Sequence, residues 1–210
     1  MSNVLAQAKP PLENLQKAAA DLRRDQLVDI ASKLIESEGI DAAKHARIAT
    51  LAGCTRSLVY HYFPTRSDLF SAINAAFYRS LDTLMPADEQ QEALRENLRG
   101  NKPNSLRLFG ILFDLLENGG WSSMILRTTP ELNADFAVYL DSIHDNYEKR
   151  WQDVIAEHFN MSEVDCALFF QHTINIAKTT FVFYRKDQLS KSQAIEKLDI
   201  AVNQLLNPYR

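Results

Sequence analysis

The sequence has little cysteine and no long apolar segment, and these absences exclude several classes of protein. Its two cysteines, Cys54 and Cys166, do not form a CxxC pair, which excludes a disulfide-stapled scaffold and a cysteine zinc site. No apolar run approaches the roughly 20 residues that a membrane-spanning helix needs, and the first residues lack the continuous apolar stretch of a secretory signal. We therefore expect a cytoplasmic protein with reduced thiols, no membrane contact, no cofactor and no metal.

Glycine and proline are also scarce, with six and seven among 210 residues, while 46% of the chain is hydrophobic. The prolines lie between apolar segments rather than inside them, and no Asn-Gly or Asp-Gly hairpin turn occurs. The apolar residues recur at helical spacing, so we predict an all-α fold. A flexible arm is expected at residues 1–20, with partial helix after Pro11 as the alternative. Helices are expected at 21–38, 44–52, 55–62, 65–84, 88–98, about 103–119, 130–159, 163–185 and 191–206.

Three of these helices are preceded by a pair of polar residues that is typical of a capping box. In this motif, two side chains at a helix N-terminus bond backbone amides that have no partner within the helix. These pairs set the expected starts of the three helices. They are Thr65 with Asp68, Ser162 with Asp165, and Ser190 with Gln193.

The net charge of −4 hides an uneven distribution of charged residues. Residues 1–66 hold nine Lys and Arg against seven Asp and Glu, whereas residues 67–210 hold fourteen against twenty. A small basic module joined to an acidic body is the asymmetry of a nucleic-acid-binding protein with a separate regulatory domain. Many neutral domains also have a basic face, so the charge alone does not decide the function.

Residues 48–63 carry the pattern of a helix-turn-helix. Ala49 is small where a second short helix would cross the first, and Gly53 can adopt the left-handed conformation of a tight turn. Val59 is apolar and can fill the space between the helices, and Thr55 can cap the second helix. This spacing is typical of a motif whose second helix lies in the major groove of DNA, although an ordinary helical hairpin shares it.

The segment VYHYFPTRSDLF at residues 59–70 extends this pattern. Together with GIDA at 39–42, IA at 48–49 and AG at 52–53, it resembles the DNA-binding domain of the tetracycline-repressor (TetR) family over about residues 24–81. The resemblance implies a helix-turn-helix DNA-binding domain at 21–66 and a helical effector-binding and dimerisation domain at 67–210. It further implies a transcriptional regulator, usually a repressor, that a small and largely apolar effector releases from a palindromic operator.

The resemblance and the side-chain chemistry together predict the residues that contact double-stranded DNA. Arg56 and Ser57 begin the recognition helix, where an arginine can bind a guanine through two hydrogen bonds. Thr55 can donate its hydroxyl to a phosphate, helped by the helix N-terminus. The full predicted set is Lys44, Arg47, Thr55, Arg56, Ser57, Tyr60, His61, Tyr62 and Arg66.

Three aromatic positions follow on the same helix. Tyr60 and His61 match family positions that contact phosphate and sometimes a base, and Tyr62 could add a phosphate contact. The alternative is that Tyr60 or Tyr62 seals the domain core. Arg66 matches a basic position at the next helix start and is expected to clamp a phosphate, the alternative being a solvated charge.

The sequence departs from the family pattern at residues 43–45, Ala-Lys-His. Family members usually have Thr or Ser here, which caps the first short helix and touches phosphate. Lys44 could make the phosphate contact as a point charge, and Asp41 could cap the helix instead. Arg47 stands where the family usually has an acidic or polar residue, so it adds positive charge near the groove.

The acidic body is rich in aromatic residues, with eight of the eleven Phe and both Trp after Met85. In the family, such a domain encloses a small-molecule pocket, and a mainly apolar lining is expected. The alternative for each aromatic residue is a plain core position. The expected lining is Phe109, Phe113, Trp121, Met124, Tyr139, His144, Tyr147, Trp151 and Phe170.

The last two predicted helices each carry an apolar stripe. The resemblance implies that they pack against their twofold mates as a four-helix bundle, which makes the protein a homodimer. A dimer places its two recognition helices about 34 Å apart, which is one turn of DNA. The expected interface residues are Leu168, Ile174, Phe181, Ile195, Leu198 and Val202.

The sequence has no GxGxxG, P-loop, HExxH or GxSxG motif, so no enzymatic activity is expected. Asp141 and His144 form a DxxH pair, but the second pair of a two-metal helical bundle is missing. The alternative function is a helical small-molecule-binding dimer without sequence-specific DNA recognition. Salt-sensitive affinity for DNA would separate the two functions, because phosphate contacts release counterions.

Overall fold

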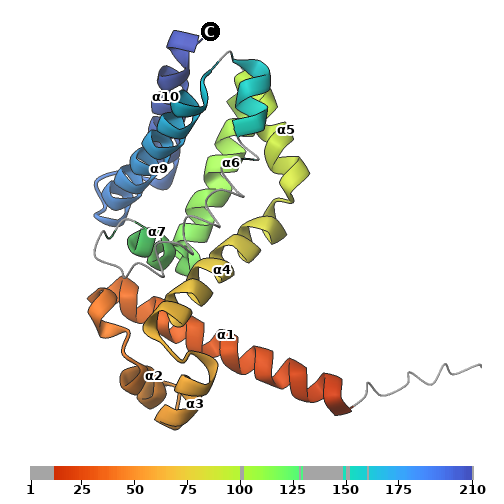
Figure 1. Ribbon diagram of the computed structural model, residues 1–210. Helices are drawn as coiled ribbons and strands as arrows, with labels where there is room; N and C mark the ends of the chain where they lie inside the picture. The colour runs from red at the N-terminus through yellow and green to blue at the C-terminus, as the bar shows by residue number, and fades with distance from the viewer. Residues whose placement is uncertain are drawn as a thin grey trace, which may run out of the picture.

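The computed structural model describes residues 12–99, 102–127, 129, 149, 152–159 and 161–209. Within these ranges every regular element is a helix, and none of the described helices is long and apolar enough to cross a membrane. Figure 1 shows a lower group of α1, α2 and α3, which α4 joins to an upper group. The helices are α1 (Leu12–Glu38), α2 (His45–Leu51), α3 (Arg56–Tyr62), α4 (Arg66–Leu84), α5 (Ala87–Leu98), α6 (Lys102–Leu115), α7 (Trp121–Arg127), α9 (Glu163–Arg185) and α10 (Lys191–Leu206).

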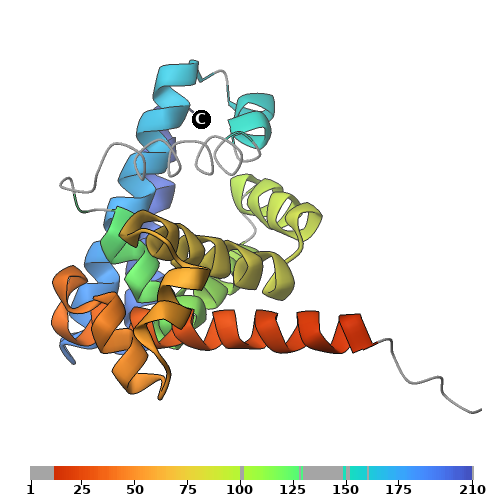
Figure 2. The ribbon, with the colours of Figure 1, turned by 60° about the horizontal axis from the view of Figure 1, so that its bottom comes forward.

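The first helix is longer than predicted, because it begins at Leu12 rather than near Asp21. Residues 12–24 are rich in Leu, Ala, Gln, Lys and Arg, which are strong helix formers. Figure 2 shows this half of α1 extending away from α2 and α3, and Leu22 is 74% exposed. The expected flexible arm is therefore helical over residues 12–20, and residues 1–11 lie outside the described part of the chain.

The lower group has its own apolar core. The buried face of α1, with Leu27 and Ile35, packs against Ile48 of α2, Val59 of α3 and Leu69 of α4, all at most 1% exposed. Because residues from four helices close this core together, the position of α3 is fixed relative to α1 and α4.

The tight turn between α2 and α3 has the geometry that the sequence predicts. Gly53 adopts a left-handed φ of 60°, and the Cys54 amide donates to the Ala49 carbonyl at 3.0 Å. Ala49 is 4% exposed and Val59 is fully buried, so the small residue and the apolar plug occupy the crossing of the two helices. These residues form a helix-turn-helix.

Capping side chains set the starts of the later helices. Thr65 and Asp68 form a reciprocal capping box at α4, and Ser190 and Gln193 form another at α10. Ser162 caps α9 through its hydroxyl, which accepts a hydrogen bond from a first-turn amide. Each cap satisfies an amide that the helix itself leaves without a partner, so these predicted starts are confirmed.

The Gly119-Gly120 pair, which predicts a helix end, forms a kink instead. Asn118 and Gly119 leave helical geometry, with a φ of +98° at Gly119, and the chain then re-enters a helix as α7. Helix α7 is absent from the prediction, and it forms because its apolar residues, including Trp121 and Leu126, become buried. The kink lets α6 and α7 pack on different parts of the molecule.

The upper group is held together by an aromatic core. The Phe181 ring lies 5.4 Å from Phe113 and 5.1 Å from Trp121, centroid to centroid. Leu198 and Val202 of α10 are buried in the same cluster. Most of the helix predicted at 130–159 lies outside the described residues, but residues 152–158 are helical, and this helical segment stops before Phe159 as predicted.

Two polar contacts join α1 and α4 to α7. The Glu36 carboxylate of α1 accepts a hydrogen bond from the Ser122 amide at 3.0 Å, which caps the N-terminus of α7. Burial raises the pKa of the Glu36 carboxyl above its ordinary value. Ser123 donates its hydroxyl to the side-chain carbonyl of Asn74 in α4, and both residues are at most 1% exposed. A shift of α7 would therefore alter its hydrogen bonds with α1 and α4.

Candidate nucleic-acid interface

Helix α3 has one buried face and one exposed face. Val59 is fully buried, whereas Arg56, Ser57, Tyr60 and His61 are exposed. The exposed four are all predicted DNA-contacting residues. The structure therefore brings these four predicted DNA-contacting residues together on the accessible side of a packed helix.

Thr55 is the N-cap of this helix. Its Oγ1 accepts a hydrogen bond from the Leu58 amide at 3.3 Å and lies 3.3 Å from the Ser57 hydroxyl. The hydroxyl hydrogen can still be donated outward, because the cap uses Oγ1 as an acceptor. Thr55 thus combines its structural role as a cap with the geometry of a phosphate donor at a helix N-terminus.

His45 is a part of the site that the sequence prediction does not contain. Its Nε2 lies 2.7 Å from the Phe63 carbonyl oxygen, and its ring stacks on Tyr60 with centroids 4.4 Å apart. The Arg56 guanidinium lies 5.7 Å from the centroid of the same Tyr60 ring. His45 thereby links the start of α2 to the end of α3 and orients Tyr60, and the departure from the family pattern at residues 43–45 was the only sign of it.

Tyr62, rather than Tyr60, seals the domain core. Tyr62 is half-buried and packs against the apolar core of the lower group, with its ring edge-on to His61 at 5.5 Å. Tyr60 remains 42% exposed. Tyr62 therefore contributes to the domain core, and Tyr60 stays accessible on the surface.

Two of the predicted phosphate-contacting arginines are engaged within the chain. Arg47 makes two hydrogen bonds to Glu38, at 2.7 and 2.6 Å. Arg66 donates to the Ile40 carbonyl at 2.5 Å and to the Asp41 carboxylate at 3.1 Å. Both side chains stay substantially exposed, so a phosphate could compete for them at the cost of these contacts.

The N-terminus of α2 differs from the expectation for Asp41. Lys44 occupies the N-cap position without a side-chain cap, and Asp41 lies in a separate 3-10 turn, Ile40–Ala42, where it pairs with Arg66. The expectation that Asp41 caps α2 is therefore wrong, because three residues separate it from the helix start. Lys44 is exposed and makes no ion pair with a residue that the structure describes.

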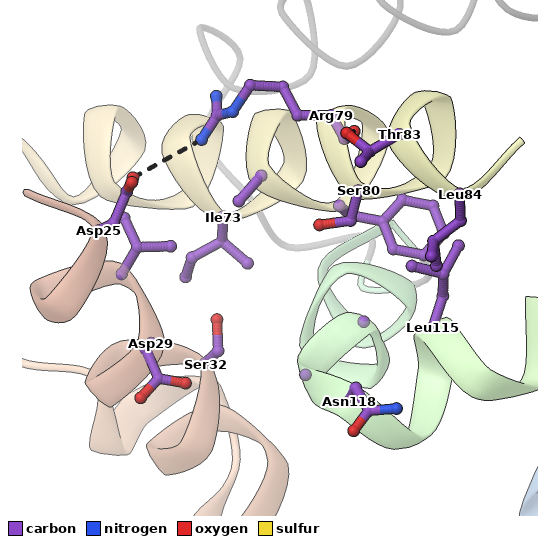
Figure 3. A pocket seen from close by; sticks show the side chains of 15 residues that line it. Asp25, Asp29, Ser32, Ile73, Arg79, Ser80, Thr83, Leu84, Leu115 and Asn118 are labelled. Carbon is purple, nitrogen blue, oxygen red and sulfur yellow. Dashed lines mark hydrogen bonds and ion pairs between the residues drawn. The ribbon is translucent and has the colours of Figure 1, made fainter. Parts of the chain in front are cut away.

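The expected effector lining falls into two sets. Phe109, Phe113, Trp121 and Met124 are at most 8% exposed and belong, with half-buried Phe170, to the packed core of the upper group. The rest lie outside the described residues, namely Tyr139, His144, Tyr147 and Trp151. A cavity of about 640 Å³ lies elsewhere, between α1, α4 and the turn that follows α6 (Figure 3).

The expected dimer-interface residues also divide. Leu168 is 51% exposed, and Ile174 and Ile195 are half-buried. Phe181, Leu198 and Val202 are at most 4% exposed and lie within the protomer's own core. The last three do not form an accessible surface of the protomer, because α6, α7, α9 and α10 pack around them.

A tight turn between two short helices, with the second helix exposed, defines a helix-turn-helix protein. Residues 27–73, from buried Leu27 in α1 to Ile73 in α4, match the family model described as "Bacterial regulatory proteins, tetR family". The N-terminal domain is therefore similar to the DNA-binding domain of the tetR family over these residues.

The comparisons with curated proteins agree with this assignment. The chain is 37% identical over 57 residues to the HTH-type transcriptional regulator AcrR of Shigella flexneri, covering 27% of this chain and 26% of that protein. It is 26% identical over 83 residues to the nucleoid occlusion factor SlmA of Haemophilus ducreyi, covering 39% and 41%. The matches thus span between about a quarter and two fifths of these relatives.

Solved structures resemble the chain over most of its length. The fatty acid degradation regulator FadR from Bacillus halodurans has a TM-score of 0.66 at 17% identity, covering 90% of this chain and 96% of that one. A tetR-family transcriptional regulator from Streptomyces coelicolor has a TM-score of 0.60 at 22% identity, covering 90% and 82%. At these identities the likeness establishes the fold.

Proposed function

We propose that this protein is a sequence-specific DNA-binding transcriptional regulator, in which α3 lies in the major groove of an operator. The observation that carries the proposal is the exposed face of α3, on which Arg56, Ser57, Tyr60 and His61 stand together above a fully buried Val59. Because packing of Val59 in the domain core fixes α3, this helix can present its exposed side chains to base edges with little loss of conformational freedom on binding.

The exposed side chains divide by the contacts that they can make. Arg56 at the start of α3 is the base-contacting residue, because its guanidinium can bind a guanine through two hydrogen bonds. Lys44, Thr55 and His61 contact phosphates, which fix the register of the protein on the duplex. The Tyr60 ring, held by its stack on His45, orients Arg56 from the side.

The proposed regulator is a homodimer that binds a pseudo-palindromic operator. Val164 and Leu168 of α9 are 68% and 51% exposed, and Ile200 of α10 is 49% exposed. These apolar side chains support an interface made by the last two helices, in place of the buried residues Phe181, Leu198 and Val202. A twofold dimer would set its two α3 helices about 34 Å apart.

A small and largely apolar effector would release the protein from its operator, which makes it a repressor. Among solved structures with this fold is FadR from Bacillus subtilis in complex with stearoyl-CoA, at a TM-score of 0.60 and 17% identity, covering 89% of this chain and 99% of that one. The contacts of Glu36 and Asn74 with α7 support a mechanical link between the upper group and the helix-turn-helix. By linkage, DNA should weaken effector binding by the same factor as effector weakens DNA binding.

The test is fluorescence anisotropy of the purified chain with duplexes from the region upstream of its own gene, at two salt concentrations. We expect tight binding to one duplex, weak binding to its scrambled version, and a steep loss of affinity as salt rises. Weak binding that is equal on all duplexes would contradict the proposal and favour a small-molecule-binding dimer that does not recognise DNA sequence.

Two matched arginine variants sharpen this test. Arg56→Ala should weaken binding to the selected duplex by roughly 5- to 150-fold and relax the preference at one base position. Arg107→Ala removes an equally charged, exposed side chain from α6, where it pairs with Glu89, and should leave DNA binding unchanged. Equal loss on every duplex with Arg56→Ala would overturn the base-contacting role.

A further inference from the structure

The cavity between α1, α4 and the turn that follows α6 has the volume of a small-molecule site. Its volume of about 640 Å³ lies within the roughly 300–1,000 Å³ of such pockets. All three segments contribute apolar side chains to its wall, and these include Val28, Ile73, Phe77, Leu84 and Leu115. None of the predicted effector-site residues that the structure describes lines this cavity, so it is a separate site from the one that the sequence predicts.

Two glycines shape one end of the cavity. A Cβ on Gly120 would lie 2.6 Å from the Leu115 carbonyl oxygen and 2.8 Å from Cδ2 of Phe77, so the turn packs directly on α4. Gly119 takes a φ of +98°, which turns the chain at this point. The backbone of the turn therefore forms this end of the wall.

One buried hydroxyl points into the cavity. Ser32 of α1 lines the cavity and is 6% exposed, and Figure 3 shows its oxygen directed away from α1, toward Ile73 of α4. This hydroxyl makes no hydrogen bond with any residue that the structure describes, whereas Ser37 on the same helix donates to the Lys33 carbonyl. Because a buried polar group without a partner is unfavourable, the Ser32 hydroxyl favours a ligand that supplies a hydrogen bond.

The charged side chains around the cavity are paired with each other and remain in water. Asp25 pairs with Arg79 at 3.8 Å and Asp29 pairs with Lys33 at 2.7 Å, and all four side chains are more than half exposed. Their charges cancel, so they do not attract an ion of either sign. A charged ligand group would lose its hydration against the apolar wall without a buried partner of opposite charge. The lining therefore favours a neutral ligand.

We infer that this cavity binds a neutral, largely apolar molecule that carries one hydroxyl or carbonyl oxygen, and that it is the effector site of the proposed regulator. The apolar part of the ligand lies against Val28, Ile73 and Phe77. Its oxygen forms a hydrogen bond with the Ser32 hydroxyl, which can either donate or accept. This inference rests on the proposed function, because an effector requires a DNA complex to release.

The cavity lies beside both hydrogen bonds that join α7 to α1 and α4. Ser32 is one helical turn before Glu36, which caps α7, and Ile73 is adjacent to Asn74, which accepts a hydrogen bond from α7. A ligand between α1 and α4 would therefore alter the packing of these two helices on α7. Both helices contribute to the core that fixes α3, so binding would bias the position of the helix-turn-helix.

Calorimetry on the full chain tests the site without DNA. The probes are octan-1-ol, octylammonium and octanoate near neutral pH, each below the concentration at which it aggregates. We expect octan-1-ol to bind most tightly. Ser32→Ala should weaken octan-1-ol binding by about 2- to 10-fold, because one neutral hydrogen bond is lost. Ser37→Ala removes an exposed hydroxyl from the same helix, outside the cavity, and should bind like the parent.

A second variant blocks the cavity by size. Ser80→Trp places a large ring from an exposed position of the lining and should abolish octan-1-ol binding, with folding checked by circular dichroism. Absence of octan-1-ol binding, tighter binding of either ion, or binding that Ser80→Trp leaves unchanged would overturn the site. Binding that Ser32→Ala leaves unchanged would overturn the role of this hydroxyl as the polar anchor.

Anisotropy then tests the effector assignment. Octan-1-ol should lower the affinity of the parent and of Ser37→Ala for the selected duplex, and should have far less effect on Ser80→Trp. Binding in the calorimeter without any change in DNA affinity would overturn the effector assignment. Failure to find a selected duplex would contradict the proposed function, and the calorimetric result distinguishes that failure from absence of the site.

Discussion

The buried hydrogen bond between Asn74 and Ser123 should contribute measurably to the stability of the molecule. Asn74 accepts from the Ser123 hydroxyl and donates through Nδ2 to the Phe70 carbonyl at 3.3 Å. Asn74 is 0% and Ser123 1% exposed, so water cannot replace a lost partner. Ser123→Ala leaves the Asn74 carbonyl without its donor, and we expect a loss of about 1–3 kcal/mol in the free energy of unfolding.

A double-mutant cycle isolates this interaction. Asn74→Ala should also cost about 1–3 kcal/mol, but the double variant should cost about 1 kcal/mol less than the two single losses together. The assay is urea unfolding followed by circular dichroism, with an unchanged m-value as the check on two-state behaviour. Thr83→Ala, which removes an exposed hydroxyl from the same helix, should change stability by less than about 0.5 kcal/mol.

Additive single losses, within about 0.5 kcal/mol, would refute the reasoning. Such a result would mean that Asn74 and Ser123 do not depend on each other, and that α7 is seated on α4 by apolar packing alone. The link from the upper group to the helix-turn-helix would then rest on Glu36.

Three further predictions concern stability and use the same unfolding assay. Gly120→Ala should lower the free energy of unfolding by about 1–3 kcal/mol, because the new Cβ meets the Leu115 carbonyl. Gly110→Ala, with open space around it, should raise that free energy by up to about 1 kcal/mol. Equal effects of the two variants would contradict the packing of the turn. Burial raises the pKa of Glu36 in the folded protein above that in the unfolded chain, so folding is stabilised as the pH falls through the folded-state pKa toward the unfolded-state pKa. Glu36→Gln should therefore flatten that part of the plot of unfolding free energy against pH. An unchanged plot would contradict this prediction. Thr65→Ala should cost about 1 kcal/mol through loss of the capping box, and a cost below about 0.3 kcal/mol would argue against it.

The features that the sequence predicted well are determined by neighbouring residues. The left-handed Gly53, the buried Val59 and the capping box at Thr65 each depend on a few consecutive positions. Residue type and spacing carry enough information for such features, because the physical cause lies within one or two turns of helix.

The features that the sequence did not predict depend on contacts between distant residues. His45 binds the Phe63 carbonyl across 18 positions, and Arg66 reaches Asp41 across 25. Apolar periodicity marks Phe181 and Leu198 as buried but does not say whether their own protomer or a second one covers them. Pairing and the identity of the covering surface are tertiary properties, and the sequence alone leaves them open.

Selection from randomised duplex DNA by the full chain tests the central claim most directly. If α3 reads DNA in a twofold dimer, the enriched sequences should contain an inverted repeat with half-site centres about one helical turn apart. Arg56→Ala should then lose the preference at one position of each half-site, while Arg107→Ala retains it. Enrichment of no common sequence, or of a motif that Arg56→Ala leaves intact, would contradict the account of α3 as the recognition helix.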